Sequence, residues 1–299
     1  MSEIHVVPVP EAVLDRCFIN ADQYQAMYDR SINDPEGFWA EQADIFIDWF
    51  DKWTEISEAD MPSGTVSWFK GGKLNIAHNC IDRHLDTRGD QTAIIWEGDA
   101  GDVLHISYRE LHEHVCRLAN GLKARGVKKG DRVCIYMPMV PEAAYAMLAC
   151  MRIGAIHSVV FGGFSPQSLR DRILDSDCRV LITADEGVRG GRTVPLKANS
   201  EEALADCPNV HTVLTVRRTG AEVAWHPERD VWYHELVAEQ SAHCEPEVMD
   251  SEDPSFILYT SGSTGKPKGV QHGTAGSLLQ AAMTHKYVCD YHDGDISWC

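Results

Sequence analysis

Short apolar segments alternate with helical segments from Gly89 to the end of the chain, and this alternation restricts the fold more than any other feature. In most of these segments apolar side chains occupy successive positions rather than every second one, as in strands buried on both faces. Strands joined through helices run parallel. The pattern therefore predicts an α/β fold with a mainly parallel sheet flanked by helices, whose ligands bind at the carboxyl ends of the strands.

The expected elements of this region follow one another in a regular order. A hairpin is expected from the segments 93–98 and 103–108. Further strands are expected at 132–136, 155–161, 179–183, 210–216 and 256–260. Helices are expected at 109–125, 141–152, 166–175, 200–206 and 274–288. Pro141 and the pair Ser165 and Pro166 are typical of the first residues of helices.

The N-terminal part of the chain has a different character. Up to Gly72 it is acidic and rich in tryptophan and phenylalanine, and the apolar spacing over 35–52 predicts a helix. A second helix is expected at 79–85. We therefore expect two units, an N-terminal cap over residues 1–85 and a larger α/β domain over 86–299.

Charge and cysteine usage exclude several classes of function. Acidic residues outnumber basic ones 45 to 27, so the net charge of -18 repels nucleic acid and anionic membranes. No signal peptide and no membrane-spanning segment are expected from the sequence. The ten cysteines contain no CxxC pair, which favours reduced thiols in the cytoplasm. No metal site is expected, because the pair His234 and Glu235 lacks the second histidine of a zinc motif.

The segment that follows the strand at 256–260 combines glycines, hydroxyls and lysines. Backbone N–H groups of glycine-rich turns, hydroxyl donors and ammonium groups together suit a triphosphate. The spacing is not that of a Walker A loop, because Pro267 follows Lys266 where that motif has serine or threonine. The candidate phosphate-binding residues are Thr260, Ser261, Gly262, Ser263, Thr264, Gly265, Lys266 and Lys268.

A second glycine-rich, basic segment follows the strand at 179–183. Arg189 and Arg192 flank Gly190 and Gly191, and fork-shaped guanidinium groups suit phosphate oxygens. A solvated turn is the alternative interpretation of this segment. A related glycine pair, Gly162 and Gly163, follows Phe161 at the end of an earlier strand, where the alternative is a simple bend.

Several motifs of this chain resemble those of one enzyme superfamily. The run YTSGSTGKPKGV at 259–270 resembles the phosphate-gripping loop of the adenylate-forming enzymes. The segments 106–111 and 148–164 resemble two further motifs of that superfamily, in the same order. The pattern RGGRxxPLK at 189–197 and FGGF at 161–164 resemble elements of short-chain acyl-CoA synthetases that contact CoA. The cap resembles the N-terminal extension of the acetyl-CoA synthetase family.

The resemblance implies an AMP-forming acetate–CoA ligase, which joins acetate to CoA through acetyl-adenylate and releases AMP and pyrophosphate. Its substrates would be acetate, CoA and ATP with Mg²⁺. It further implies that the segment 260–268 holds the β- and γ-phosphates, that Arg189 and Arg192 contact CoA phosphates with Gly190 and Gly191 between them, and that the backbone at 161–163 passes beside CoA. Propionyl- or acetoacetyl-CoA synthetase remains an alternative, as does a noncatalytic nucleotide- or CoA-binding module.

Enzymes of this family carry further functional parts beyond the phosphate loop. The resemblance implies that the acyl pocket, the catalytic lysine and a C-terminal lid domain lie past Cys299. We therefore expect this chain to be an N-terminal part with an incomplete adenylation domain that does not turn over alone. No catalytic residue is assigned within it, and acyl preference and oligomeric state are not readable from it.

Overall fold

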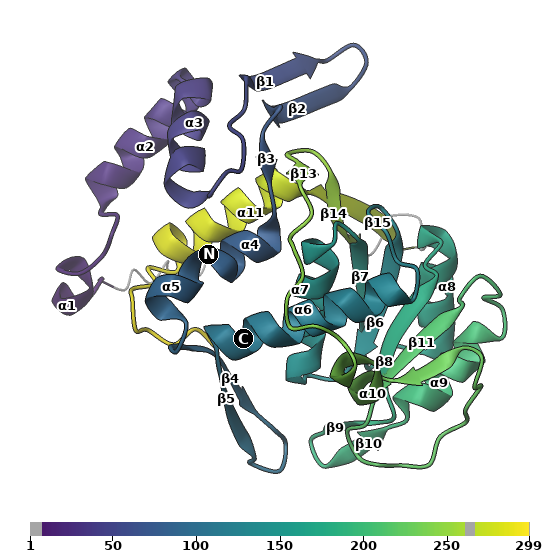
Figure 1. Cartoon of the computed structure of the whole chain (residues 1–299). Coiled ribbons are helices and arrows are strands. Elements are labelled where there is room, and N and C mark those ends of the chain that lie inside the picture. Colours follow the sequence, from purple (N-terminus) through teal and green to yellow (C-terminus); the bar gives the residue numbers. More distant parts are fainter. Residues whose placement is uncertain (1–7, 261–266, 299) are drawn as a thin grey trace, which may run out of the picture.

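The computed structural model describes residues 8–260 and 267–298, and its centre is a sheet of seven strands (Figure 1). These strands are β6 (Arg132–Met137), β7 (Ile156–Phe161), β8 (Val180–Ala184), β11 (Thr212–Val216), β12 (Asp230–Trp232), β14 (Pro254–Thr260) and β15 (Lys268–Gly273). Their order is β12-β11-β8-β6-β7-β14-β15, and all neighbours are parallel except β14 and β15. The predicted α/β fold with a mainly parallel sheet is confirmed.

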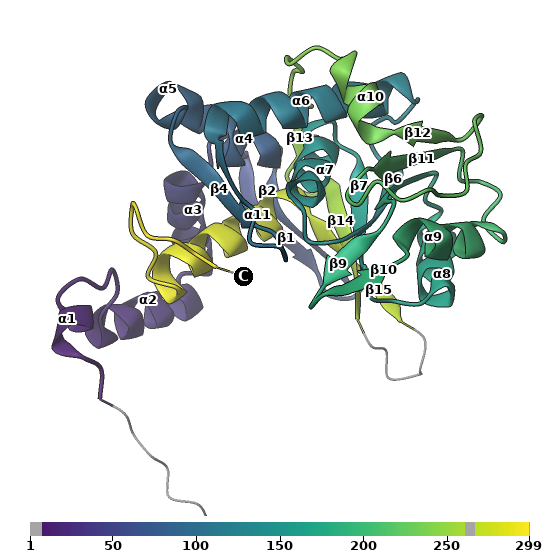
Figure 2. The ribbon, with the colours of Figure 1, turned by 90° about the horizontal axis from the view of Figure 1, so that it is seen from below.

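Helices cover both faces of this sheet (Figure 2). One face carries α6 (Tyr108–Ala124), α7 (Pro141–Arg152) and α10 (Tyr233–Ala238), and the other carries α8 (Pro166–Ser176) and α9 (Leu196–Leu204). Local chemistry explains the starts of three of them. Ser107 and Glu110 form a reciprocal capping box at α6, Pro141 occupies the first turn of α7, and the Ser165 side chain caps α8. The apolar sides of these helices close the core on either side of the sheet.

Two small hairpins extend from the sheet domain. The pair β4 (Thr92–Glu97) and β5 (Val103–Ser107) confirms the predicted hairpin, whereas the pair β9 (Gly187–Arg189) and β10 (Arg192–Val194) was expected only as a glycine-rich turn. The short β12 and α10 and the antiparallel β15 were not predicted either. The helix expected at 200–206 begins earlier, at Leu196, because its first turn is buried against the sheet.

The N-terminal part forms short elements around the edge of the sheet domain. They are α1 (Glu11–Leu14), α2 (Ala21–Asn33), α3 (Pro35–Phe46), β1 (Glu55–Asp60), β2 (Thr65–Lys70), β3 (Lys73–Leu74), α4 (Ile76–Cys80), η1 (Asp82–His84) and α5 (Leu85–Arg88). The predicted helix over 35–52 was too long, since the chain becomes extended at Ile47. Beyond that point Trp49 packs its ring against Trp53 and Phe69, a tertiary contact that a continued helix would not make.

The cap packs against the helix that follows β15. This helix, α11 (Thr274–Met283), is continued by one π-helical turn, η2 (Thr284–Val288), and it lies beside α3 and α4 (Figure 1). Ala275 and Leu279 of α11 are buried in one cluster with Ala43 and Leu74 of the cap. In addition, β3 pairs with β13 (Met249–Asp250), directly before β14. The cap therefore braces the β14–β15 hairpin at both of its ends.

A buried ion pair joins the cap to the sheet domain. Arg152, the last residue of α7, is 1% exposed, and its guanidinium donates to both carboxylate oxygens of Asp82 at 2.8 and 2.9 Å. The Arg152 Nε donates to the carbonyl of Cys244. His112 Nε2 lies 3.5 Å from the same carboxylate. Although burial opposes ionisation, hydrogen bonds from His112 and Arg152 hold the pKa of Asp82 well below its usual range.

Asn75 makes a second connection between the cap and the end of α7. Its fully buried amide donates to three carbonyl oxygens, those of Met151, Arg152 and Glu247, at 2.9 to 3.2 Å. Its side-chain oxygen accepts from the backbone N–H of His78 and so caps α4. One side chain therefore satisfies backbone groups at the end of α7 and at the start of α4.

Within 8–260 and 267–298, no helix is long and apolar enough to cross a membrane.

We expect Asp82→Asn to lower the free energy of unfolding by about 3–5 kcal/mol, because it leaves the buried Arg152 charge without its partner. Urea denaturation measures the loss. Asp86→Asn is the matched control, since Asp86 is exposed and forms no ion pair with the described residues. The double variant with Arg152→Met should lose less than Asp82→Asn alone, and an equal or larger loss would contradict the assignment.

We also expect a pH dependence from His112. The hydrogen bond with Asp82 raises the pKa of His112 to about 9, from an ordinary value of 6.5. Arg152 and Cys116 are its other neighbours. The interaction of protonated His112 with Asp82 contributes its full stabilisation to the fold below pH 6.5, and this contribution disappears as the pH rises through about 9. The unfolding free energy should therefore fall between these values, and His112→Gln should flatten the profile. An unaltered slope in His112→Gln would refute this source.

Candidate functional site

The predicted site residues gather where the parallel strands end. The carboxyl ends of β6, β7, β8, β11 and β14 lie at one edge of the sheet because these strands are parallel. The segments that leave this edge after β7, β8 and β14 contain all three predicted groups. The structure therefore brings the candidate phosphate-binding and CoA-binding segments to the same side of the molecule, as expected for a sheet of this kind.

The candidate phosphate-binding segment joins β14 to β15. Thr260 and Lys268 are the last pair of that antiparallel ladder, and both are exposed. Gly269 lies opposite Tyr259, and a side chain at Gly269 would meet the Tyr259 ring at 3.2 Å. The other predicted members lie outside the described residues, so their roles stay predictions from the sequence. They are Ser261, Gly262, Ser263, Thr264, Gly265 and Lys266.

The bend after β7 depends on its two glycines. A Cβ at Gly162 would lie 2.9 Å from the carbonyl oxygen of Met137, and a Cβ at Gly163 would lie 2.5 Å from the Phe161 ring. The Met137 carbonyl oxygen therefore approaches Gly162, and the Phe161 ring approaches Gly163, more closely than any residue with a side chain would allow. The hydroxyl of Tyr136, a fully buried residue of β6, donates to the carbonyl of Phe164 at 2.8 Å and fixes the end of the bend.

The arginine-bearing segment is a tight hairpin rather than an open turn. Gly190 and Gly191 both have positive φ, 57° and 71°, which a two-residue hairpin turn requires. Arg189 and Arg192 are consequently direct cross-strand partners, and both are exposed. Like charges in that position repel each other, and neither arginine forms an ion pair with the described residues. The pair is therefore suited to an anion that bridges both guanidinium groups.

The two predicted CoA-binding segments contact each other. The guanidinium carbon of Arg189 lies 4.9 Å from the centre of the Phe161 ring, a cation–π distance. Phe161 is 48% exposed, so the stacked pair remains open on the outside. The backbone N–H of Gly191 donates to Asp99, in the turn between β4 and β5, at 3.1 Å. The hairpin is thus held near its tip by two contacts, one to Phe161 and one to Asp99.

The carboxylate of Asp185 stabilises two segments that leave this edge of the sheet, and the sequence analysis assigned it no role. Its carboxylate is 1% exposed and accepts hydrogen bonds from the backbone N–H groups of Glu186, Arg218, Thr219 and Gly220. A buried carboxylate satisfied by backbone donors fixes the segment after β11 against the segment after β8. Its position directly after a buried strand was the only signal available in the sequence.

Lys197 closes the RGGRxxPLK pattern but faces away from the edge. Its side chain is fully buried, and its ammonium group bonds to Glu201, to Asp230 at 2.8 Å and to the carbonyl of Ala224 at 2.9 Å. Burial opposes the charge of Glu201, and hydrogen bonds from Arg229 and Lys197 overcome this and lower its pKa. Lys197 therefore anchors α9, and only the arginines of the pattern are free to meet a ligand.

Two histidines near β14 have structural positions. His157 of β7, Phe256 of β14 and His272 of β15 form a stack with ring centres 5.5 and 4.5 Å apart. Burial lowers the pKa of His157 to about 4, so this imidazole is neutral at physiological pH. The stack ties the three neighbouring strands together on one face of the sheet.

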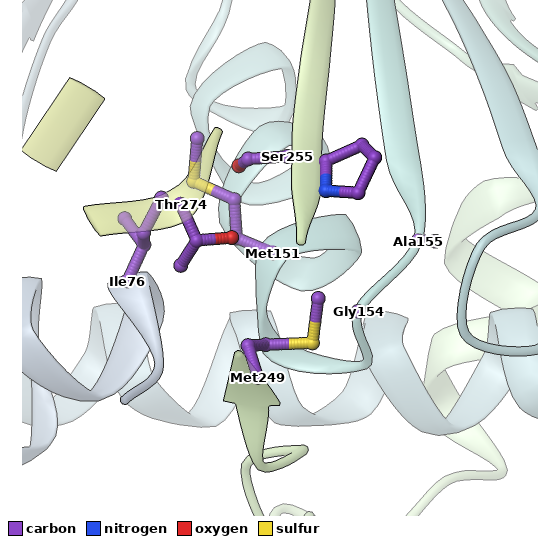
Figure 3. Close-up of a pocket in the computed structure, with 8 residues that line it drawn as sticks. Ile76, Met151, Gly154, Ala155, Met249, Ser255 and Thr274 are labelled. Carbon is purple, nitrogen blue, oxygen red and sulfur yellow. The ribbon is translucent and has the colours of Figure 1, made fainter. Parts of the chain in front are cut away.

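Two hollows lie at opposite edges of the sheet. The crevice in Figure 3, lined by Met151, Met249, Thr274 and others, lies at the amino end of β14 and has no room for a water molecule. It is therefore a packing joint between the cap and the sheet domain. An open hollow of about 280 Å³ lies beyond the carboxyl end of β11, lined by Arg217 and His234 among others. Sequence reasoning did not foresee it.

The sequences of several known proteins align with this chain over its full length. Acetyl-coenzyme A synthetase from Halorhodospira halophila is 67% identical over 300 residues, and acetyl-coenzyme A synthetase 2 from Pseudomonas aeruginosa is 65% identical over the same length. Both alignments cover 100% of this chain and 46% of the relative. The chain thus spans about half the length of these relatives.

Structure and family comparisons agree with the sequence comparison. The acetoacetyl-CoA synthetase from Streptomyces lividans superimposes with a TM-score of 0.84 at 26% identity, over 94% of this chain and 42% of that protein. The family described as AMP-binding enzyme matches residues 81–299, and the one described as acetyl-coenzyme A synthetase N-terminus matches residues 24–80. The chain therefore belongs to the AMP-binding enzyme family, with an N-terminal segment of the acetyl-coenzyme A synthetase type.

Proposed function

We propose that this chain supplies the pyrophosphate-holding and CoA-holding half of an AMP-forming acetate–CoA ligase. The observation that supports this proposal most strongly is that Arg189, Phe161 and Thr260 all lie at the edge of the sheet where the parallel strands end. The chain that carries them is 67% identical to an acetyl-coenzyme A synthetase. Acetate, CoA and ATP as its Mg²⁺ complex are the proposed substrates. The other half of the site, including the acyl pocket and the activating lysine, would come from residues beyond this chain.

In the proposed first half-reaction, an acetate oxygen attacks the α-phosphorus of ATP, and the bond to the pyrophosphate oxygen breaks. Acetyl-AMP and pyrophosphate result. The segment from Thr260 to Lys268 would hold the β- and γ-phosphates, so that negative charge developing on the leaving group meets N–H, O–H and ammonium donors. The proposed contribution of this segment is positioning and charge neutralisation, because no covalent bond forms between its residues and the substrate.

In the proposed second half-reaction, the CoA thiolate attacks the acetyl carbon of acetyl-AMP, and AMP leaves as the carbon–oxygen bond breaks. Arg189 and Arg192 would hold the phosphates of the CoA nucleotide. Their exposure, their direct pairing across the hairpin and the absence of a carboxylate partner among the described residues support this role. Gly162 and Gly163 would let CoA pass close to the backbone beside Phe161.

We further propose a cap over residues 1–85 and an adenylation domain from 86 onward. The separate clusters around Phe69 and around Ile135 support that division, although α11 of the second unit packs into the first cluster and Ile81 of the cap is buried in the second. A cytoplasmic location is also proposed. All cysteines within the described residues are free, and six of them are buried, which suits a reducing compartment.

The alternatives receive less support. An acetoacetyl-CoA synthetase shares the fold, but at 26% identity, whereas relatives named acetyl-coenzyme A synthetase reach 57–67%. A noncatalytic nucleotide- or CoA-binding module could use the same two segments, so the ligase is favoured by the 57–67% identity to relatives named acetyl-coenzyme A synthetase rather than by the segments themselves. Acetate is therefore the proposed acyl substrate.

We expect Lys266→Ala and Gly265→Ala in the full-length protein to lower the rate of acetate-dependent ATP–pyrophosphate exchange by about 10²-fold. The first removes an ammonium donor to the leaving pyrophosphate, and the second adds a methyl group where the proposal needs backbone N–H groups close to the phosphates. Isotope exchange at saturating acetate measures the step directly. Lys128→Ala is the control, since Lys128 is exposed at the opposite edge of the sheet. Exchange at the original rate and ATP affinity in both variants would refute the proposed role.

We expect Arg189→Ala and Arg192→Ala each to raise the KM for CoA by about 10-fold or more, because each removes a charge-assisted hydrogen bond to phosphate. ATP–pyrophosphate exchange should be unaffected, since it precedes CoA attack. Arg179→Ala serves as control, because Arg179 is an exposed arginine at the amino end of β8. If the KM for CoA stays unchanged in both variants, the hairpin is not the CoA site.

A further inference from the structure

A buried arginine lies between the two proposed substrate segments. Arg172 belongs to α8 and is 8% exposed, yet no carboxylate within the described residues forms an ion pair with it. Its Nη1 donates to the carbonyl of Ser168, one turn earlier on the same helix, at 2.7 Å. A charge buried in this way is costly unless other groups stabilise it. The groups that face the guanidinium are therefore informative.

Two aromatic rings from different segments face the Arg172 guanidinium. Its central carbon lies 4.9 Å from the centre of the Phe164 ring and 5.3 Å from that of the Tyr259 ring. Phe164 ends the bend beside the proposed CoA site, and Tyr259 is the penultimate residue of β14, directly before Thr260. A planar guanidinium stacks on ring faces, which an ammonium group cannot do.

Each of the two rings is held in place by its own neighbours. Tyr136 donates to the backbone of Phe164, whose ring packs edge-on against Phe161 at 5.7 Å. The Tyr259 hydroxyl donates to Asp175 at 2.7 Å, and its ring lies against Gly269 of β15. With Arg189 stacked on Phe161, an unbroken row of side chains runs from the arginine hairpin to the strand that enters the phosphate segment.

We infer that Arg172 is a positioning residue that sets the proposed CoA bend and the proposed phosphate segment relative to each other. The inference rests on the proposed function. Arg172 touches neither substrate, and it acts through Phe164 on one side and Tyr259 on the other. Acetyl transfer requires CoA to reach an adenylate formed at the phosphate segment, so the spacing between these two segments matters for the second half-reaction. The first half-reaction depends on Arg172 only through Tyr259, which leads into the phosphate segment.

The test uses the full-length protein and measures the KM for ATP in the exchange reaction and the KM for CoA in acetyl-CoA formation. Arg172→Met should raise both by about five-fold or more. Arg170→Met is the matched control, because Arg170 lies on the same helix but pairs with Asp171 and Asp206. It should leave both values unchanged.

Single-ring variants and a conservative replacement separate positioning from folding. Phe164→Leu should raise mainly the KM for CoA, and Tyr259→Leu mainly that for ATP. Arg172→Lys keeps the charge without a planar stack, so it should keep the melting temperature and still raise both values. This variant decides the matter if Arg172→Met does not fold.

Two contrary results have different meanings. A lowered melting temperature with both KM values unchanged in Arg172→Lys and Arg172→Met would show a purely structural residue and overturn the inference alone. No acetate-dependent exchange in the unaltered protein would instead contradict the proposed function, and the inference would fall with it.

Discussion

The parallel pairing of β14 with β7 is the constraint on which the candidate site depends. Phe256 pairs with His157 and Ile257 with Ser158, and beyond these pairs the two strands continue to Thr260 and Phe161. This short ladder brings the end of β14 at Thr260, where the candidate phosphate-binding segment begins, to the same edge as the glycine bend after Phe161. The ring stack of His157, Phe256 and His272 reinforces it across three strands. A slip by one residue would turn the side chains of β14 to the opposite face of the sheet and break the contact between Tyr259 and Arg172.

The hairpin of β14 and β15 also needs support from outside the sheet, and the cap provides it. The segment before β14 is bonded to the cap through Lys73 and Asp250, and the helix after β15 is buried against Ala43 and Leu74. Asn75 and Asp82 connect the cap in turn to the end of α7. The N-terminal segment is therefore part of the framework of the candidate site, although none of its elements between residues 8 and 85 is a strand of the seven-stranded sheet.

The sequence was informative wherever a signal lies within one element or one turn. The mainly parallel sheet, the start of α7 at Pro141 and the grouping of Arg189 with Phe161 follow from local composition and from the rule that parallel strands end at one edge, whereas the order of the strands was not predicted. The sequence was uninformative where contacts join distant residues. Arg172 meets Tyr259 across 87 positions, and the helix predicted over 35–52 ends at Phe46 because Trp49 packs on Phe69. No spacing within a segment encodes either contact.

The charge distribution connects these observations. The chain is strongly acidic, and carboxylates neutralise some of its least exposed arginines, as Asp82 does for Arg152 and Glu201 does for Arg229. Arg189 and Arg192 are different, because hairpin geometry sets them opposite each other and neither forms an ion pair with the described residues, although the Asp99 carboxylate accepts from the N–H of Gly191 between them. In a protein with so many carboxylates, an exposed pair of this kind costs stability through mutual repulsion. A bound phosphate group would remove that repulsion, so the same two side chains that weaken the free hairpin would strengthen the complex.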